Sequence, residues 1–475
     1  MYKNTVLMAV VMAFMAITAS AKVKLHHLIA SGMVIQQNTE VRLWGTADAG
    51  KTIKVKVSWN NEKYSTKADN SGRWMVKVKS PKASYTPLSI TFDDGQPLTI
   101  DNVLSGEVWV CAGQSNMEMP VKGFGNCPVD RYNDVVVEAT KVKGIHFAKI
   151  PSTMSFTPQE DADCKWEVVN AATVGNCSAT GYFFARMINR ALDIPVGLIL
   201  ANKGGTRVES WLDEANIKQH TDENLDPKAM EKLAYDYYRP MVWGYGTFSP
   251  ILNYTVHGIL FYQGCSNVGY NTDKYAERLA LLVKQWRSGF GLGNIPFYFV
   301  QIAPYAYNGV DGTQGALLRE QQLKAVDLIP NSDIVCTNDC VYPYETQQIH
   351  PAQKQKVGER LAGIALNKDY GMKEIMCESP KFKDMTVSND TCYVHLKDDY
   401  YGISRYEDLQ GFEVAGADKV FHKANAYYYW TKGIIITCQE VKKPVAVRYC
   451  FRDFKIGNVG NQAQLPLFPF RTDQW

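Results

Sequence analysis

The sequence predicts an α/β protein: a parallel sheet flanked by helices, with N-terminal and C-terminal β-rich accessory domains. Three observations lead to this fold class. Short, continuous apolar runs in the middle of the chain are typical of strands that are covered on both faces. Segments of helical periodicity lie between those runs, and strands that alternate with helices predict a parallel sheet. Before and after this region, apolar and polar residues alternate with period two, as they do in antiparallel strands.

These patterns divide the chain into consecutive parts. We expect a β-sandwich-like domain over residues 22–104, the α/β domain over 105–373 and a small β domain over 374–475. The strands expected in the α/β domain are 108–110, 196–200, 259–261, 297–300 and 334–335. The helices expected there are 182–192, 275–286, 317–328 and 354–366. Ligands bind at the carboxyl ends of the strands in such sheets, so a site is expected just after each strand.

Residues 1–21 have the composition of a secretory signal peptide. Lys3 precedes an uncharged apolar stretch, and Ala19-Ser20-Ala21 offers small residues for cleavage after Ala21. The stretch is too short for a membrane-spanning helix, and no later segment offers the roughly 20 apolar residues that a span requires. We therefore expect an exported protein, periplasmic or extracellular, with no transmembrane span.

Charge and cysteine content exclude several classes of partner. The chain has 51 basic and 48 acidic residues, and its formal net charge of +3 argues against nucleic acid as the main partner. All 11 cysteines follow the signal peptide, and the odd number leaves one thiol over if the others pair. Spacing alone proves neither a Cys336–Cys340 nor a Cys438–Cys450 disulfide. No paired C-x-x-C steps are present, so no metal is expected. The oligomeric state is not determined by the sequence.

Four strand ends in the α/β region carry the parts of an acyl-transfer site: a hydroxyl nucleophile, glycines, an amide donor and an imidazole. A serine hydroxyl needs a base to take its proton, and the pKa of histidine suits that task. Of the 8 histidines, only His350 follows the last α/β strand in the place expected of the base. We therefore expect Ser115 to be the nucleophile and His350 its general base, whereas His257 is expected to be a packed core residue.

The segments that follow the strands are Gly113-Gln114-Ser115-Asn116-Met117, Gly204-Gly205-Thr206 with Glu209 and Trp211, Tyr262-Gln263-Gly264, and Ile349-His350-Pro351. Together they resemble the sialate O-acetylesterases, a family within the SGNH, or GDSL-like, hydrolases. The resemblance extends to residues 33–45 near the start of the mature chain and to residues 443–449 and 469–472 near its end. It therefore covers nearly the whole mature chain and implies an SGNH-type sheet.

The resemblance also implies roles for single residues. Ser115 would be the nucleophile and His350 the base. The oxyanion hole implied by the family consists of the N–H of Ser115, the N–H of Gly205 (or, less favoured, Gly204) and the side chain of Asn267. The residues expected to bind substrate are Gln114, Gln263, Arg207 and Glu209, although a structural ion pair is an equal alternative for Arg207 and Glu209.

Two positions depart from the family pattern. Cys265 stands where relatives usually have a glutamate, which places the substrate preference in doubt; a disulfide or an inert thiol is a better reading of it than a rival nucleophile. Gln347 stands where the wider superfamily has an aspartate three residues before the catalytic histidine. Glu345 is the candidate for the missing third member, Asp339 is a weaker one, and a backbone carbonyl could orient His350 instead.

The expected function is hydrolysis of acetyl esters on carbohydrates by a serine esterase that needs no cofactor. The resemblance favours O-acetylated sialic acid as the substrate. Acetylated xylan, pectin or another plant glycan is the alternative within the same enzyme class. An alternative of a different class is a glycan-binding protein with a degenerate site, and turnover of a simple aryl acetate would separate an enzyme from such a binder.

Overall fold

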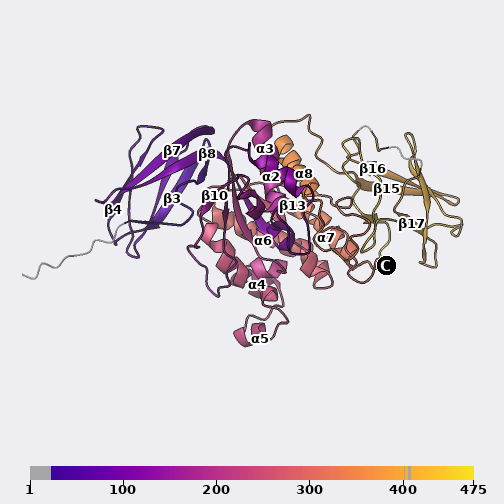
Figure 1. Ribbon diagram of the computed structural model, residues 1–475. Helices are drawn as coiled ribbons and strands as arrows, with labels where there is room; N and C mark the ends of the chain where they lie inside the picture. Colours follow the sequence, from indigo (N-terminus) through magenta and orange to yellow (C-terminus); the bar gives the residue numbers. More distant parts are fainter. Residues whose placement is uncertain (1–22, 401, 405–407) are drawn as a thin grey trace, which may run out of the picture.

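The computed structural model describes residues 23–400, 402–404 and 408–475 (Figure 1). A β-rich part, drawn in indigo, is followed by a central α/β part and then by a second β-rich part in orange and yellow. This arrangement confirms the predicted α/β fold class with β-rich regions on both sides. The predicted signal peptide, residues 1–21, lies outside the described residues.

The central sheet has the strand order β10-β9-β11-β8-β12-β13-β14. Neighbouring strands are parallel except for the pair of β9 and β10. Every residue of β11 and β12 is buried, which explains why these segments are continuous apolar runs. The strands are β8 (Leu98–Gly113), β9 (Ile145–Lys149), β10 (Trp166–Val168), β11 (Val196–Asn202), β12 (Gly258–Tyr262), β13 (Phe297–Val300) and β14 (Ser332–Val335).

Helices cover both faces of this sheet. One face packs on α3 (Ala179–Leu192) and α8 (Lys354–Lys368), and the other packs on α6 (Tyr275–Phe290) and α7 (Gln314–Leu328). These are the four helices that the sequence predicts, each within about four residues of its expected bounds. The remaining helices are α1 (Ser115–Glu118), α2 (Tyr132–Ala139), α4 (Glu214–His220) and α5 (Pro227–Glu231). Short 3-10 or π turns are η1 (Val174–Asn176), η2 (Val208–Trp211), η3 (Asp236–Tyr238), η4 (Gly244–Phe248), η5 (Ser249–Ile251), η6 (Cys265–Asn267) and η7 (Thr272–Lys274).

Strand β8 joins the N-terminal part to the central sheet. Its first half pairs with β7 (Ser84–Asp93) and β2 (Val34–Gln36), and its second half pairs with β11 and β12. The boundary expected between residues 104 and 105 therefore falls inside one continuous strand. The other N-terminal strands are β1 (Lys24–Leu25), β3 (Glu40–Thr46), β4 (Thr52–Val57), β5 (Tyr64–Lys67) and β6 (Arg73–Lys79).

The C-terminal part contains two four-stranded sheets around a core of its own. The boundary expected between residues 373 and 374 falls in the segment between α8 and the first strand of this part. The first sheet contains β15 (Lys381–Ser388), β16 (Thr391–Lys397), β20 (Gly433–Thr437) and β19 (Asn425–Tyr429). The second contains β18 (Phe421–Lys423), β17 (Phe412–Ala415), β21 (Ala446–Tyr449) and β22 (Phe470–Arg471).

Two further properties bear on the expectations from the sequence. Among the described residues, no helix combines the length and the apolar character that a membrane span needs. All 11 cysteines of the chain lie in the described ranges, and each is a free thiol. Neither of the two neighbouring cysteine pairs forms a disulfide in this structure.

Candidate active site

Ser115 and His350 meet at the carboxyl end of the central sheet. Ser115 is the first residue of α1 and is separated from β8 by Gln114 alone, while His350 lies in the segment between β14 and α8. The His350 Nε2 and Ser115 Oγ atoms are 2.7 Å apart. A hydroxyl and an imidazole at this distance have the geometry of a nucleophile and its base.

Gly113 allows the sharp turn that presents Ser115. Its φ is +133°, and a Cβ at this position would collide with the carbonyl of Tyr262 on the neighbouring strand β12. Gln114, and not Ser115, is the N-cap residue of α1. The Ser115 hydroxyl is therefore not used to cap the helix and remains paired with His350.

The turn of Gly204 and Gly205 lies against Ser115. A Cβ at Gly204 would stand 3.4 Å from the Cβ of Ser115. The N–H of Gly204 already donates to a carboxylate oxygen of Glu118 at 2.7 Å. The N–H groups of Gly205 and Ser115 have no acceptor among the described residues. These two backbone donors are the ones that the resemblance assigns to the oxyanion hole.

Asn267, expected as the third oxyanion donor, is fully buried in a polar network beneath the site. Its Nδ2 donates to the two carboxylate oxygens of Glu209 at 3.0 and 3.4 Å. Its Oδ1 accepts from the N–H of Val208 at 3.0 Å and from Gln263 Nε2 at 2.9 Å. Glu209 also pairs with Arg278 at 2.5 Å. The amide of Asn267 is thus engaged within the protein.

The two glutamines expected to bind substrate have different surroundings. Gln263 Nε2 also donates to the Thr206 carbonyl at 3.0 Å, and Gln263 Oε1 accepts from the Tyr275 hydroxyl at 2.8 Å, so this side chain belongs to the buried network. Gln114 Oε1 accepts from the N–H of Gly264 at 2.8 Å. Its Nε2 has no partner in the part of the chain that the structure describes, which leaves one amide donor next to Ser115.

Arg207 does not pair with Glu209. Its guanidinium carbon lies 3.9 Å from the ring centre of Tyr238 and 3.3 Å from that of Tyr270. Its Nε donates to the Ser266 carbonyl at 3.3 Å. The structure therefore holds this cation between two aromatic rings, and within the described ranges no carboxylate lies at ion-pair distance from it.

Neither acid considered for the third triad position contacts the imidazole. The Glu345 carboxylate accepts from the N–H of Tyr342 at 2.7 Å and from the N–H of Ala352 at 3.0 Å. Asp339 pairs with Arg360 at 2.6 Å. None of the hydrogen bonds described for Glu345 reaches the His350 ring. Glu345 instead stabilises the backbone segment that carries the histidine, because its carboxylate accepts hydrogen bonds from N–H groups on both sides of His350.

Lys354 and Asn116, which the sequence analysis does not single out, tie the nucleophile segment to the histidine segment. The buried Lys354 Nζ donates to the Pro351 carbonyl at 2.6 Å and to Asn116 Oδ1 at 2.9 Å. Asn116 Nδ2 donates to the Ile349 carbonyl at 3.0 Å. The carbonyls on both sides of His350 are therefore bound to residues that contact the Ser115 segment. The sequence did contain a signal for Lys354, because it is a lysine on the apolar face of the predicted helix 354–366.

The comparisons with known proteins agree with this geometry. Residues 105–367 match the family described as carbohydrate esterase, sialic acid-specific acetylesterase. The chain belongs to this family. The sialate O-acetylesterase of Homo sapiens is 26% identical over 383 residues, which cover 74% of this chain and 72% of that protein. The enzyme of Mus musculus is 24% identical over 440 residues, or 81% of this chain and 80% of that protein.

A solved structure extends the similarity beyond the matched region. The crystal structure of a carbohydrate acetylesterase from Xanthomonas citri has a TM-score of 0.84 and 28% sequence identity, and the match covers 96% of this chain and 100% of that one. The predicted family and the predicted class of carboxylic ester hydrolase are thereby confirmed. Ser115, His350 and the Gly204-Gly205 turn all lie inside the residues that match the family.

In this carbohydrate esterase the histidine at the site is held neutral. Burial and the nearby Lys354 ammonium lower the pKa of His350 to about 4. Burial lowers the pKa of Lys354 itself to about 8. A neutral imidazole at neutral pH is the form that can accept a proton from the Ser115 hydroxyl.

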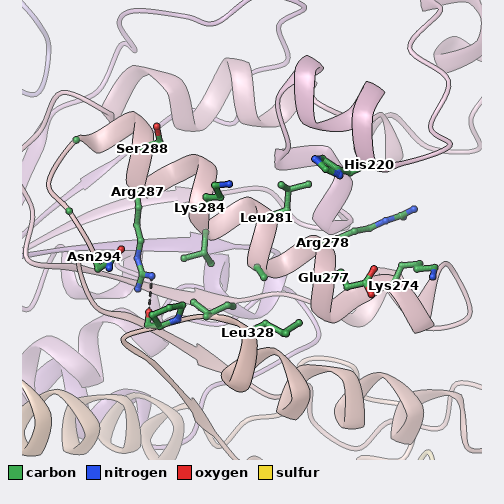
Figure 2. A pocket seen from close by; sticks show the side chains of 16 residues that line it. His220, Lys274, Glu277, Arg278, Leu281, Lys284, Arg287, Ser288, Asn294 and Leu328 are labelled. Atoms are coloured by element: carbon green, nitrogen blue, oxygen red, sulfur yellow. Dashed lines mark hydrogen bonds between the residues drawn. The ribbon is translucent and has the colours of Figure 1, made fainter.

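A conspicuous pocket of the esterase lies elsewhere. A cavity of about 850 Å³ lies beside α6. Figure 2 shows the side chains that line it, among them Arg287, which donates to the Pro330 carbonyl at 2.7 Å. Its described lining includes neither Ser115 nor His350. A larger cavity, of about 1490 Å³, is not lined by Ser115 or His350 either, so cavity volume alone would misplace the site. Among the described residues, no group of three or more His, Cys, Asp or Glu side chains is arranged to hold a metal ion.

Proposed function

We propose that this esterase removes acetyl groups from O-acetylated sialic acid, with Ser115 as nucleophile and His350 as general base. The observation that carries the proposal is the 2.7 Å contact between Ser115 Oγ and His350 Nε2, beside two unengaged backbone N–H groups. The sialate O-acetylesterases among its relatives, 24–26% identical, support this substrate class.

The geometry supports a double-displacement route. Ser115 Oγ attacks the acetyl carbonyl while its proton passes to His350 Nε2. The resulting oxyanion accepts hydrogen bonds from the N–H groups of Ser115 and Gly205. His350 then gives the proton to the departing sugar oxygen, which leaves an acetyl-enzyme. A water molecule repeats the sequence on the acetyl-enzyme and releases acetate. The chain's own residues supply each step, and no cofactor takes part in the scheme.

A side-chain donor for the oxyanion is better assigned to Gln114 than to Asn267. Asn267 would have to give up its hydrogen bonds to Glu209 to reach the substrate, at a cost of about 1.5–3 kcal/mol for bonds to a charged group. The Nε2 of Gln114 has no such commitment and lies one residue from the nucleophile. Asn267 and Glu209 then serve to hold the segment that follows β12.

Two cations beside the Gly204-Gly205 turn support an acidic sugar as the substrate. Arg207 lies between two tyrosine rings, and the Lys203 ammonium lies 4.5 Å from the ring centre of Trp243. No carboxylate of the described chain forms an ion pair with either side chain, although Glu223, which accepts from the Tyr270 hydroxyl at 2.7 Å, interacts electrostatically with Arg207. Both cations can still pair directly with a carboxylate of the substrate. Sialic acid carries such a carboxylate, whereas the neutral sugars of acetylated xylan do not.

Acetate release tests the function and the substrate class together. We expect the purified mature enzyme to release acetate from 9-O-acetyl sialic acid and from an aryl acetate, and Ser115→Ala to lose more than about a thousandfold of both activities. Arg207→Gln should raise KM for the sialate and leave turnover of the aryl acetate unchanged. Faster release from acetylated xylan than from the sialate would transfer the assignment to plant glycans, and absence of aryl acetate turnover would favour a glycan binder.

We further propose that the chain is exported and that residues 1–21 are removed. Lys3, the apolar stretch and Ala19-Ser20-Ala21 support this proposal. N-terminal sequencing of the protein from an extracytoplasmic fraction should begin at Lys22. Recovery of an intact Met1 from that fraction would contradict the proposal.

A further inference from the structure

The second nitrogen of the His350 ring faces a cysteine. His350 Nδ1 and Cys127 Sγ are 3.7 Å apart, and the two residues are 223 positions apart in the chain. Cys127 Sγ also lies 3.2 Å from Gln348 Oε1. The cysteine is buried, and its thiol is not oxidised to a disulfide. The position that a carboxylate occupies in a Ser-His-Asp triad is thus filled here by a thiol.

A short turn fixes both sides of this contact. The N–H of Phe124 donates to the Cys127 carbonyl at 3.0 Å, and the N–H of Cys127 donates back to the Phe124 carbonyl at 3.2 Å. The Phe124 ring packs edge-on against the His350 imidazole, with ring centres 5.2 Å apart. Gln348 Oε1 also accepts from the backbone N–H of His350 at 3.2 Å. The imidazole therefore lies in a cradle made by residues 124–127 and Gln348.

The chemistry of the base assigns the protons in this cradle. For His350 Nε2 to accept the Ser115 proton, the neutral ring must carry its own proton on Nδ1. That N–H can only donate toward Cys127 Sγ, the described acceptor at this edge of the ring. The thiol hydrogen can then be donated to Gln348 Oε1, at 3.2 Å, or to Asn126 Oδ1, at 3.4 Å. The Nδ1–H of His350 and the thiol hydrogen of Cys127 each have an acceptor in this arrangement.

We infer that Cys127 is a positioning residue for catalysis, which accepts the Nδ1–H of His350 and holds the ring in its reactive tautomer in place of the missing acid. The inference rests on the proposed roles of Ser115 and His350. A thiol carries no negative charge in this arrangement, so it orients the ring but stabilises the imidazolium less than a carboxylate would. The charged group that acts on the same ring is the Lys354 ammonium, which destabilises the imidazolium.

Substitution of Cys127 by residues with and without an acceptor tests the inference. Cys127→Val fills a similar volume and removes the acceptor, so kcat on an aryl acetate should fall about 10- to 100-fold with KM nearly unchanged. Cys127→Ser keeps an acceptor and should recover most of that loss. Cys177→Ala is the matched control, because Cys177 is buried in the same core and has no described contact with His350; its kcat should equal that of the wild type.

Cys127→Asp provides a readout that packing alone would not change. An anion at this position should stabilise the imidazolium and move the acidic limb of the kcat/KM profile to higher pH by more than about one unit. A Val enzyme that stays within twofold of wild-type kcat, or an Asp enzyme with an unshifted profile, would overturn the role of Cys127. Neither result touches the proposed function, which is tested separately by the activity of Ser115→Ala and by acetate release from the sialate, acetylated xylan and an aryl acetate.

Discussion

Two histidines occupy opposite ends of the central sheet and have opposite charge states. His257 precedes β12 at the amino end of the sheet, where its Nδ1 lies 2.8 Å from a Glu107 oxygen and its Nε2 lies 3.8 Å from Asp369. Burial acts to lower its pKa, but the hydrogen bonds with Asp369 and Glu107 outweigh burial and raise the pKa to about 9. His350, at the carboxyl end, has no carboxylate partner among the described residues and a pKa of about 4.

The difference shows how surroundings decide what a histidine does. His257 is packed between the rings of Trp109 and Tyr370, as expected for a core residue, and it is also a cation that neutralises buried acids. Such a histidine stabilises the fold and cannot take a proton at neutral pH. His350 is buried without an acid and next to an ammonium group, so it remains a free base. Because both are single histidines beside apolar strands, composition alone does not separate them.

The largest expected effect separates the two histidines by function. His350→Ala should lower kcat on an aryl acetate by about a thousandfold, because general-base catalysis by a positioned histidine contributes about 10² to 10⁴ in rate. Its midpoint of thermal unfolding should stay close to the wild-type value. Stopped assays of acetate release, with calorimetry on the same samples, measure both quantities. A His350→Ala enzyme with wild-type kcat would show that His350 is not the general base.

His257→Ala should produce the reverse pattern. Removal of the cation leaves Glu107 buried without its charge partner, although Gln36, Gln37 and Tyr370 still donate to it. We expect the free energy of unfolding to fall by about 2–4 kcal/mol, with kcat at 25 °C unchanged. Urea unfolding at pH 6 measures the loss. His257→Gln, which keeps a donor, is the control and should lose less stability.

The same histidine predicts how stability depends on pH. Its pKa is raised in the folded state, so its contribution is fully present below the unfolded pKa of about 6.5 and is lost as pH rises through about 9. The wild-type protein should therefore lose on the order of 2–3 kcal/mol between pH 6.5 and 9, and His257→Ala should lose much less over this range. If the free energy of unfolding depended on pH equally in the two proteins, His257 would not be the cation.

A smaller effect concerns the low pKa of His350. The neutral base is lost as pH falls, so the kcat/KM of the wild type should decline only as pH drops through about 4. Lys354→Met removes the cation that acts on the ring, so the decline should begin at a higher pH, although burial, the larger cause, still holds the pKa of His350 below the ordinary histidine value of about 6.5. Lys356→Met, in the same helix and half exposed, is the control and should leave the profile in place. An unshifted Lys354→Met profile would assign the low pKa to burial alone.

The fold and the positions of the site segments could be predicted because they depend on local patterns. The apolar runs that became β11 and β12 and the helical periods that became α6 and α8 are each contained in one stretch of sequence. Strands β9 and β10 were not predicted, since β10 has only three residues and His146 interrupts the apolar run of β9. Ser115, His350 and Gly205 could be proposed as site residues because each follows a strand of the same sheet.

The partners of those residues could not be predicted, because long-range contacts decide them. Asn267 has the residue type of an oxyanion donor, but the burial of Glu209 next to it takes up its amide hydrogens. Cys127 lies in a loop without a recognisable motif, and only the folded chain brings it to His350. Lys354 follows the histidine closely in sequence, yet its role depends on the Asn116 side chain, which lies 238 positions away.

The smallest expected effect concerns Glu345, the acid that the sequence offers as the third triad member. Both of its carboxylate oxygens are taken by backbone N–H groups, those of Tyr342 and Ala352. Glu345→Gln keeps one acceptor oxygen and turns an NH2 group toward the other N–H, so the free energy of unfolding should fall by about 1–2 kcal/mol. The kcat should stay within about threefold of the wild type at every pH, because the acid does not stabilise the imidazolium. Steady-state kinetics on one soluble acetyl ester, with urea unfolding of the same preparation, decide the matter. A kcat more than about a hundredfold lower, with KM and stability unchanged, would mean that Glu345 reaches the ring during turnover and that His350 resembles His257 in having an acid as its partner after all.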